Sequence, residues 1–215
     1  MLKPQEGIEY NKIENINLNR IQNIIENVQK FKVYEELMLE VNKMCECLSF
    51  GIEADKFESA IQELGTMLGY ASQRPDKYIR KGPDNLWALG ENSYIMIECK
   101  SEVSKERKEI YKSEVGQMEN HCGWFDKEYK DAKVLRIMII PTVHIAYDAD
   151  FTHDVRIMSK ENLKALKKNV ISFFKELKDY DLCGLEEHFI HKILKTHKLD
   201  NCSILEAYTV VPKKR

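Results

Sequence analysis

The chain has 215 residues, with 33 Lys or Arg against 35 Asp or Glu, and a formal net charge of -2 at pH 7. This balance argues against a protein that coats nucleic acid through bulk charge, so any nucleic-acid contact must come from a local basic patch. The length suits a single α/β domain with additional helices.

The longest apolar runs, such as 137–140, are far shorter than the roughly 20 residues of a membrane-spanning helix. No signal peptide opens the sequence, and its six cysteines show no regular disulfide framework. We therefore expect a cytoplasmic protein that is not attached to a membrane and keeps its thiols reduced.

Two or three helices are predicted before residue 52, because apolar residues recur there at helical spacing. These residues are Ile13, Ile16, Ile21, Ile24, Ile25 and Val28, followed by Val33, Leu37, Leu39, Val41 and Met44. We assign 1–52 as an N-terminal helical region. A further helix is predicted over 56–68, with Asp55 as its N-cap.

A basic segment over 72–81 follows that helix and is predicted to be a loop. Its cations lie just upstream of Asp84, where they could hold a phosphodiester backbone without reading the base sequence. The four candidate nucleic-acid-binding residues are Arg74, Lys77, Arg80 and Lys81. The alternative is a basic loop that is simply solvated.

A β-hairpin is predicted next, with strands over 82–89 and 94–100. The sequence between them, Gly90-Glu91-Asn92-Ser93, is typical of a tight hairpin turn and fixes the register of the two strands. Residue numbers that pair across this turn sum to roughly 183, so Asp84 and Glu98 are expected to lie almost directly opposite each other.

The end of this hairpin is the strongest candidate for a functional site. Side chains alternate along a strand, which places Lys100 on the same face as Glu98 and turns Cys99 toward a core. Two ionised carboxylates so close together would repel each other, so a positive group should lie between them. Two hard oxygen ligands and one ammonium suit Mg²⁺ or Mn²⁺ better than zinc. The alternative is a surface hairpin that carries Glu98 and Lys100 on its solvent face.

Four further elements are predicted after the hairpin from their periodicity. They are a helix over 114–125, a buried strand over 133–140, a short strand over 155–158 and a helix over 162–177. The sequence from Leu182 to Tyr208 is again helical in character, and we assign 181–215 as a C-terminal helical extension.

Pro83-Asp84, followed after thirteen residues by Glu98-Cys99-Lys100, resembles the signature of the PD-(D/E)XK nuclease superfamily. The resemblance implies a restriction-endonuclease-like α/β core (αββαβ) with a mixed central sheet flanked by helices, which we assign to 53–180. It also implies that Asp84, Glu98 and the backbone carbonyl of Cys99 hold Mg²⁺. Lys100 would orient the attacking water and stabilise negative charge, or act as a base if its pKa is depressed.

In this superfamily the helix before the hairpin often donates one more Glu, and Glu58 and Glu63 are the candidates. They are about 500° apart around the helix, so only one can face the site. Phe57-Glu58 resembles the start of that helix in archaeal-resolvase-like members, which favours Glu58 as a further metal ligand. Gln117 resembles the glutamine of the RecB-like branch, although His121 stands where a tyrosine is usual. The alternatives are a solvated helix-face Glu and a surface Gln.

These residues predict a metal-dependent nuclease that hydrolyses phosphodiester bonds of DNA, with RNA a less favoured substrate. An alternative is a nuclease-fold module that binds nucleic acid or a partner protein without cutting. A third is a helical partner-docking protein whose hairpin is incidental.

The stretch from Phe57 to about Leu177 also resembles nuclease domains that accompany DEAD/DEAH-type helicases in bacterial and phage-defence systems. The likeness implies a helicase or other ATPase partner. This chain itself has no glycine-rich loop ending in Gly-Lys-Ser/Thr, so we do not expect it to use ATP. Enzymes that cut both strands often act with two-fold symmetry, so cleavage of both strands would imply a homodimer.

Overall fold

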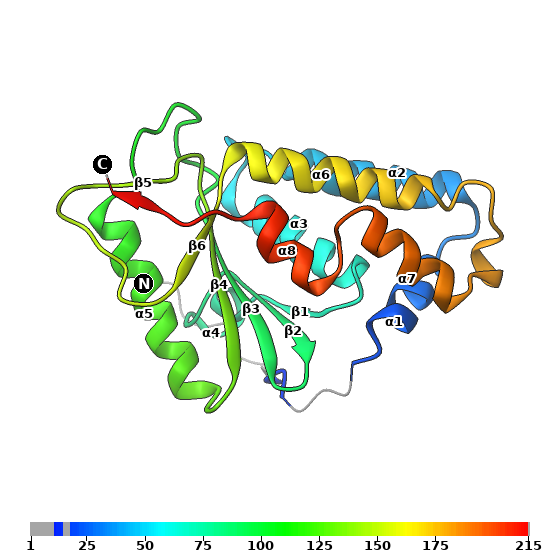
Figure 1. Cartoon of the computed structure of the whole chain (residues 1–215), viewed down its shortest axis with the longest axis horizontal. Coiled ribbons are helices and arrows are strands. Elements are labelled where there is room, and N and C mark those ends of the chain that lie inside the picture. Colours follow the sequence, from blue (N-terminus) through cyan, green and yellow to red (C-terminus); the bar gives the residue numbers. More distant parts are fainter. Residues whose placement is uncertain (1–10, 15–17, 215) are drawn as a thin grey trace.

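The computed structural model describes residues 11–14 and 18–214; the predicted apolar position Ile16 and both chain ends lie outside these residues. Five strands form a mixed sheet in the order β1-β2-β3-β4-β6 (Figure 1). They are β1 (Ala71–Gln73), β2 (Asn85–Gly90), β3 (Ser93–Cys99), β4 (Lys133–Ile139) and β6 (Val155–Met158). The first three pair antiparallel, whereas β3, β4 and β6 run parallel.

Helices cover both faces of this sheet (Figure 1). On one face, Met118 of α5 (Lys112–Glu128) packs in a buried cluster with Met96. On the other, Ile97 belongs to a second buried cluster. The helices that contribute to this second cluster are α1 (Arg20–Val28), α2 (Tyr34–Cys47), α3 (Ala54–Met67), α6 (Lys160–Lys175), α7 (Glu187–Thr196) and α8 (Asn201–Tyr208). The predicted α/β class with a mixed central sheet is confirmed. Among the described helices, none is long and apolar enough to cross a membrane.

The predicted N-terminal and C-terminal helical regions pack together on the second cluster. Arg20 of α1 donates hydrogen bonds to the backbone carbonyls of Leu68 (2.7 Å) and Leu199 (2.6 Å). A single guanidinium thereby joins the first helix, the end of α3 and the turn before α8. The helices before and after the central segment therefore share one core with it.

β2 and β3 form the predicted hairpin. Glu91 (φ 49°) and Asn92 (φ 53°) adopt the left-handed conformation that a two-residue turn requires. The register pairs Asn85 with Ile97, so the next step along the ladder places Asp84 opposite Glu98. The predicted opposition of the two acids is therefore present.

The elements predicted after the hairpin are also present, with ends shifted by a few residues. The helix predicted over 114–125 is α5, and the strand predicted over 133–140 is β4. The strand over 155–158 is β6, and the helix over 162–177 is α6, which starts earlier because Ser159 caps it by accepting a hydrogen bond from the Asn162 N–H.

The segment predicted as a basic loop over 72–81 is instead a strand and a short helix. β1 pairs with β2, with Gln73 opposite Leu86, and α4 (Pro75–Ile79) follows with Pro75 in its first turn. The pairing partner of β1 lies more than ten residues away, so local sequence pattern does not reveal this strand. The core therefore contains one more antiparallel strand than predicted.

The predicted N-cap of α3 is also wrong. The helix begins at Ala54 with Glu53 as its N-cap, and Asp55 lies in the first turn. The Asp55 carboxylate instead pairs with Arg74 (2.9 Å) and Lys77 (2.6 Å). Partners from α4 and the residue before it thus override the local capping preference.

The C-terminal extension is not entirely helical. After α8, Val210 exchanges two backbone hydrogen bonds with Ile157, which covers the outer edge of β6. The chain then pairs as β7 (Lys213–Lys214) with β5 (His144–Ile145) in a second, two-stranded sheet. This tail protects a sheet edge that would otherwise be open.

Gly65→Ala is expected to destabilise the protein by about 1 to 3 kcal/mol, because the added methyl overpacks the contact between α3 and β2. A Cβ at Gly65 would lie 2.5 Å from Trp87 Nε1 and 2.9 Å from Ser72 Oγ. Gly116→Ala is the matched control, since a Cβ there meets nothing within 4 Å among the described residues. It should be neutral or stabilising by about 0.5 to 1 kcal/mol. Urea unfolding measures both, and equal effects would contradict the close packing at Gly65.

Candidate active site

Asp84 and Glu98 meet at the end of the β2–β3 hairpin. Asp84 is 7% exposed and Glu98 is fully buried. The Asp84 Oδ2 atom accepts a hydrogen bond of 2.6 Å from the backbone N–H of Cys99, which fixes the carboxylate against the neighbouring strand. Two buried acids thus lie side by side, next to the backbone of Cys99.

Each carboxylate oxygen of Glu98 has its own partner. Lys100 Nζ donates to Oε1 at 2.6 Å, and His121 Nδ1 lies 2.7 Å from Oε2. Because an ionised carboxylate can only accept, His121 is the donor of this hydrogen bond. Lys100 also donates to Gln117 Oε1 at 2.8 Å. Gln117 and His121 are one turn apart on α5, so this helix closes one side of the site.

The two acids differ in electrostatics. Burial raises the pKa of Asp84 well above its usual value, and the charges of Glu98 and Glu58 raise it further. Burial alone would also raise the pKa of Glu98, but the hydrogen bond from His121 and the charge of Lys100 outweigh it and lower that pKa. Glu98 is therefore a carboxylate at neutral pH, whereas the surroundings of Asp84 oppose its ionisation.

Lys100 remains an ammonium in this site. Burial would lower its pKa, but the charge of Glu98 and the hydrogen bond between them raise the pKa above its usual value. Of the two predicted roles for Lys100, a positive charge that stabilises an anion fits these surroundings, and a neutral base does not.

Glu58 lies on the site side of α3. Burial raises the pKa of Glu58, and the charge of Glu98 adds to this; the charge of Glu58 in turn adds to the raised pKa of Asp84. Asn85 Nδ2 donates to the backbone carbonyl of Glu58 at 3.1 Å, joining α3 to the start of β2. The pKa of Glu63 is raised by burial and by the charge of Glu40 of α2, and no acid of the hairpin contributes to it. Between the two candidate acids, Glu58 is the one brought to the hairpin end.

The predicted basic residues separate into two groups. Arg74 is buried, and its guanidinium forms ion pairs with Glu58 and with Asp55. It therefore holds Glu58 in place rather than facing solvent as expected for a phosphate contact. The remaining three, Lys77, Arg80 and Lys81, are exposed on α4 and just after it.

No match to this chain was found in comparisons with protein-family models, curated proteins and solved structures. What can be inferred about function therefore depends on the arrangement of these side chains.

The donor atoms suit a hard divalent cation. Asp84 and Glu98 offer carboxylate oxygens, the Cys99 backbone offers a carbonyl, and Glu58 adds a third acid nearby. Burial raises the pKa of Asp84, repulsion from Glu98 and Glu58 raises it further, and a cation would offset that repulsion. Within the part of the chain that the structure describes, no group of three or more His, Cys, Asp or Glu side chains is arranged to hold a metal ion on its own. Mg²⁺ keeps several waters and uses one or two protein carboxylates, so the oxygens of Asp84 and Glu98 are of the kind that it would use.

Two residues of this site have roles that differ from those predicted from the sequence. Arg74 was predicted to contact phosphate, and its place beside Glu58 depends on β1, which was not predicted. His121 was noted only as a departure from the usual tyrosine, yet it bonds directly to Glu98. Its position one turn after Gln117 on the same helix is the sequence signal that could have assigned it.

Proposed function

We propose that this protein is a metal-dependent nuclease with a restriction-endonuclease-like core, and that it hydrolyses phosphodiester bonds of DNA. The observation that carries the proposal is the placement of Asp84 opposite Glu98, with Lys100 fixed beside them by Glu98 and Gln117. Two acids and an ammonium at one hairpin end supply both a cation site and a positive charge for a phosphoryl group.

In this proposal Asp84, Glu98 and the Cys99 carbonyl hold Mg²⁺ or Mn²⁺, and Glu58 completes the shell. When bound, the ion would polarise the scissile phosphate and make a bound water more acidic. Lys100 stabilises the negative charge that develops on the phosphoryl oxygens, since its ammonium is held rigidly by two acceptors.

Lys100→Ala is expected to lower metal-dependent cleavage by about 10²-fold or more, the usual cost of removing one fixed charge that stabilises the transition state. Supercoiled, linear and single-stranded DNA would be incubated with Mg²⁺, with Mn²⁺ and with chelator. Lys168→Ala, an exposed lysine on α6, is the control and should cut like wild type. Cleavage by Lys100→Ala at the wild-type rate would overturn the proposal.

One observation favours a second candidate, a nuclease-fold module that binds nucleic acid without cutting. Both oxygens of Glu98 are engaged by Lys100 and His121, so a cation must share or displace these partners. Calorimetric titration with Mn²⁺ separates the two candidates. The nuclease should show a site that disappears in Asp84→Ala, whereas the inert module should show no such site in either protein.

A further inference from the structure

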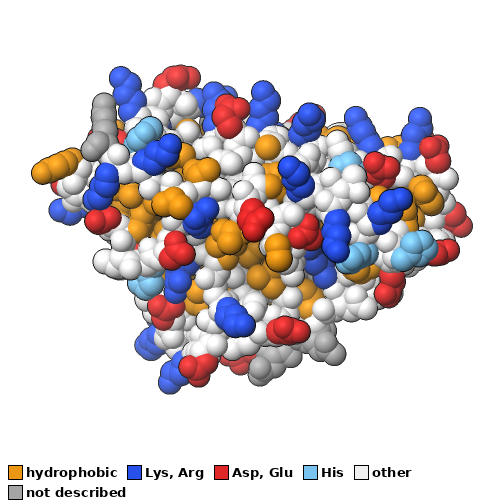
Figure 2. Space-filling view, in the orientation of Figure 1, with side chains coloured by type: hydrophobic (Ala, Val, Ile, Leu, Met, Phe, Trp, Pro, Cys, Tyr) orange, Lys and Arg blue, Asp and Glu red, His pale blue; other side chains and the backbone are white. Residues whose placement is uncertain are grey.

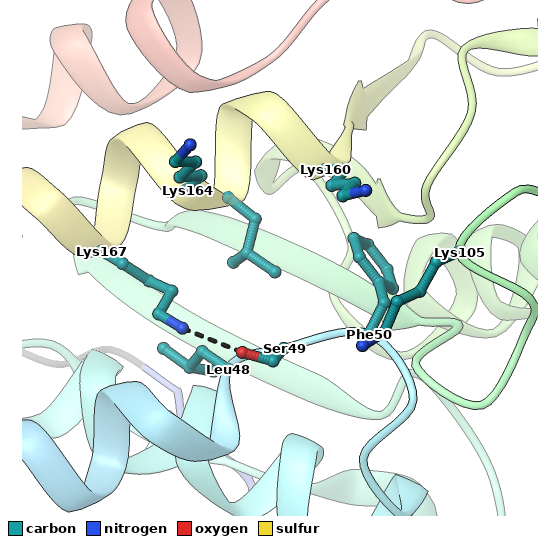
Figure 3. Close-up of a pocket in the computed structure, with 8 residues that line it drawn as sticks. Leu48, Ser49, Phe50, Lys105, Lys160, Lys164 and Lys167 are labelled. Atoms are coloured by element: carbon teal, nitrogen blue, oxygen red, sulfur yellow. Dashed lines mark hydrogen bonds between the residues drawn. The ribbon is translucent and has the colours of Figure 1, made fainter.

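A second site candidate lies away from the acids, between the C-terminal end of α2 and the first half of α6 (Figure 3). It is a cavity of about 250 Å³ with an apolar floor and a rim of lysines. The residues that line it are Leu48, Ser49, Phe50, Lys105, Lys160, Leu163, Lys164 and Lys167. We call it the lysine pocket.

The lysine pocket concentrates positive charge without acids in its lining. Lys160, Lys164 and Lys167 follow one another at helical spacing along one face of α6, and Lys105 approaches from the opposite side (Figure 3). Within the described chain, these four lysines form no ion pair. Like charges at this spacing repel each other, and Lys160 lies at the positive end of the helix dipole. A bound anion would relieve both effects.

One lysine is fixed toward the cavity. Lys167 Nζ donates a hydrogen bond of 3.0 Å to Ser49 Oγ, which links α6 to the end of α2 (Figure 3). Its neighbours Lys164 and Lys160 are exposed. Figure 2 shows Lys and Arg side chains along the edge of the molecule that α6 forms. The pocket thus combines one ordered ammonium with others that solvent, or a ligand, can reach.

The floor of the pocket is apolar. Leu48, Phe50 and Leu163 line it between the lysines. Each is at most 4% exposed, and the part of each side chain that stays accessible faces the cavity. Simple phosphate does not need such a floor, whereas a nucleotide has a planar apolar face beside its phosphate. In a duplex the faces of each base are covered by stacking and its edge is paired, so only an unpaired nucleotide can place a base face on this floor.

The lysine pocket lies within reach of a strand bound at the acids. Lys105 follows Lys100 by five residues, so their Cα atoms are at most about 17 Å apart. The backbone N–H of Gly51 donates to the carbonyl of Ser101 at 2.7 Å, which holds the intervening loop against the segment after α2. A nucleic-acid strand with a phosphate at Lys100 would therefore have further phosphates near the pocket.

We propose that the lysine pocket binds an unpaired nucleotide of the strand cleaved at Asp84 and Glu98, with its phosphate on the lysines and its base on the apolar floor. This inference rests on the proposed nuclease function and adds a substrate class to it. The preferred substrate carries a single-stranded segment next to the scissile phosphate. Duplex DNA without such a segment leaves the pocket unused.

Fluorescence anisotropy in chelator, where cleavage is absent, tests the pocket with a labelled single-stranded DNA and its duplex. The double variant Lys160→Gln with Lys164→Gln should weaken single-strand binding about tenfold and reduce the salt slope by about 0.7 for each phosphate that the lysines no longer neutralise. Duplex binding should change much less. The matched control, Lys168→Gln with Lys175→Gln, removes two exposed lysines of the same helix outside the pocket and should stay within about twofold of wild type.

Three outcomes would overturn the proposal for the lysine pocket. The first two are an equal loss of affinity in the pocket and control variants, and an equal loss of affinity for single-stranded and duplex DNA in the pocket variant. The third is that the pocket variant binds inorganic phosphate or anionic vesicles more weakly than wild type but binds single-stranded DNA as well as wild type does. The nuclease proposal is judged separately by the Lys100→Ala assay. Lysine-independent binding with intact cleavage overturns only the pocket. Lysine-dependent binding without cleavage of any substrate overturns only the nuclease.

Discussion

Glu98→Gln is expected to destabilise the folded protein by about 3 to 5 kcal/mol at pH 7, because it breaks a buried ion pair from one side. Glu98 is fully buried, and its two oxygens accept from Lys100 and His121. The glutamine side chain has one oxygen and one NH₂ group, so it can accept from only one of these two donors. Its NH₂ group would face the other donor, and neither of those two groups could accept a hydrogen bond from the other. Lys100 would also lose the carboxylate with which its ammonium forms an ion pair. Metal-dependent cleavage should be lost in the same variant.

Urea unfolding in chelator measures this loss without interference from bound metal. Glu102→Gln is the matched control, because Glu102 is an exposed glutamate in the loop just after the site. Its effect should stay within about 0.5 kcal/mol, as expected of a surface substitution. A loss at Glu98 no larger than that of the control would show that the contacts to Lys100 and His121 do not stabilise the fold.

The pH dependence of this loss has a definite sign. The pKa of Glu98 in the folded protein lies below the usual value of 4.5, so its ionised form contributes stability above pH 4.5. That contribution disappears as the pH falls through the lowered pKa. The difference in unfolding free energy between wild type and Glu98→Gln should therefore be largest near neutral pH and shrink in acid.

The hairpin and its acids were predictable because their signals are local. Glu91 and Asn92 set the turn, the turn sets the register, and the register brings Asp84 opposite Glu98. The alternation of side chains then places Lys100 beside Glu98. Each step depends on residues fewer than twenty positions apart, so the core of the candidate site could be predicted from sequence.

The parts that could not be predicted depend on contacts between distant segments. β1 exists because it pairs with β2, and Arg74 is drawn inward because that pairing carries it to Glu58. The lysine pocket joins Ser49 to Lys167, which are 118 positions apart. Periodicity along the chain describes each helix but does not indicate which helix ends will meet.

Asp84→Asn is expected to have the opposite effect on stability to Glu98→Gln. It should raise the free energy of unfolding in chelator by about 1 to 2 kcal/mol while abolishing metal-dependent cleavage, a common trade-off at active sites. Burial and the charges of Glu98 and Glu58 oppose ionisation of Asp84. Asparagine removes the charge and retains an oxygen that can accept from the Cys99 N–H. Asp148→Asn, at an exposed turn, is the control and should change stability little.

The pH dependence and the response to metal distinguish this mechanism from a general gain in packing. The pKa of Asp84 is raised in the folded state, so wild type loses stability as the pH rises above the usual value of 3.8. The advantage of Asp84→Asn should thus be absent at lower pH and grow toward neutrality. Added Mg²⁺ should reverse it, because a cation that binds only the folded wild type adds about 2.7 kcal/mol at a hundredfold excess over its Kd. If Mg²⁺ raises the melting temperatures of wild type and Asp84→Asn equally, then Asp84 is not a metal ligand, and the unfavourable burial of its carboxylate is not explained by metal binding.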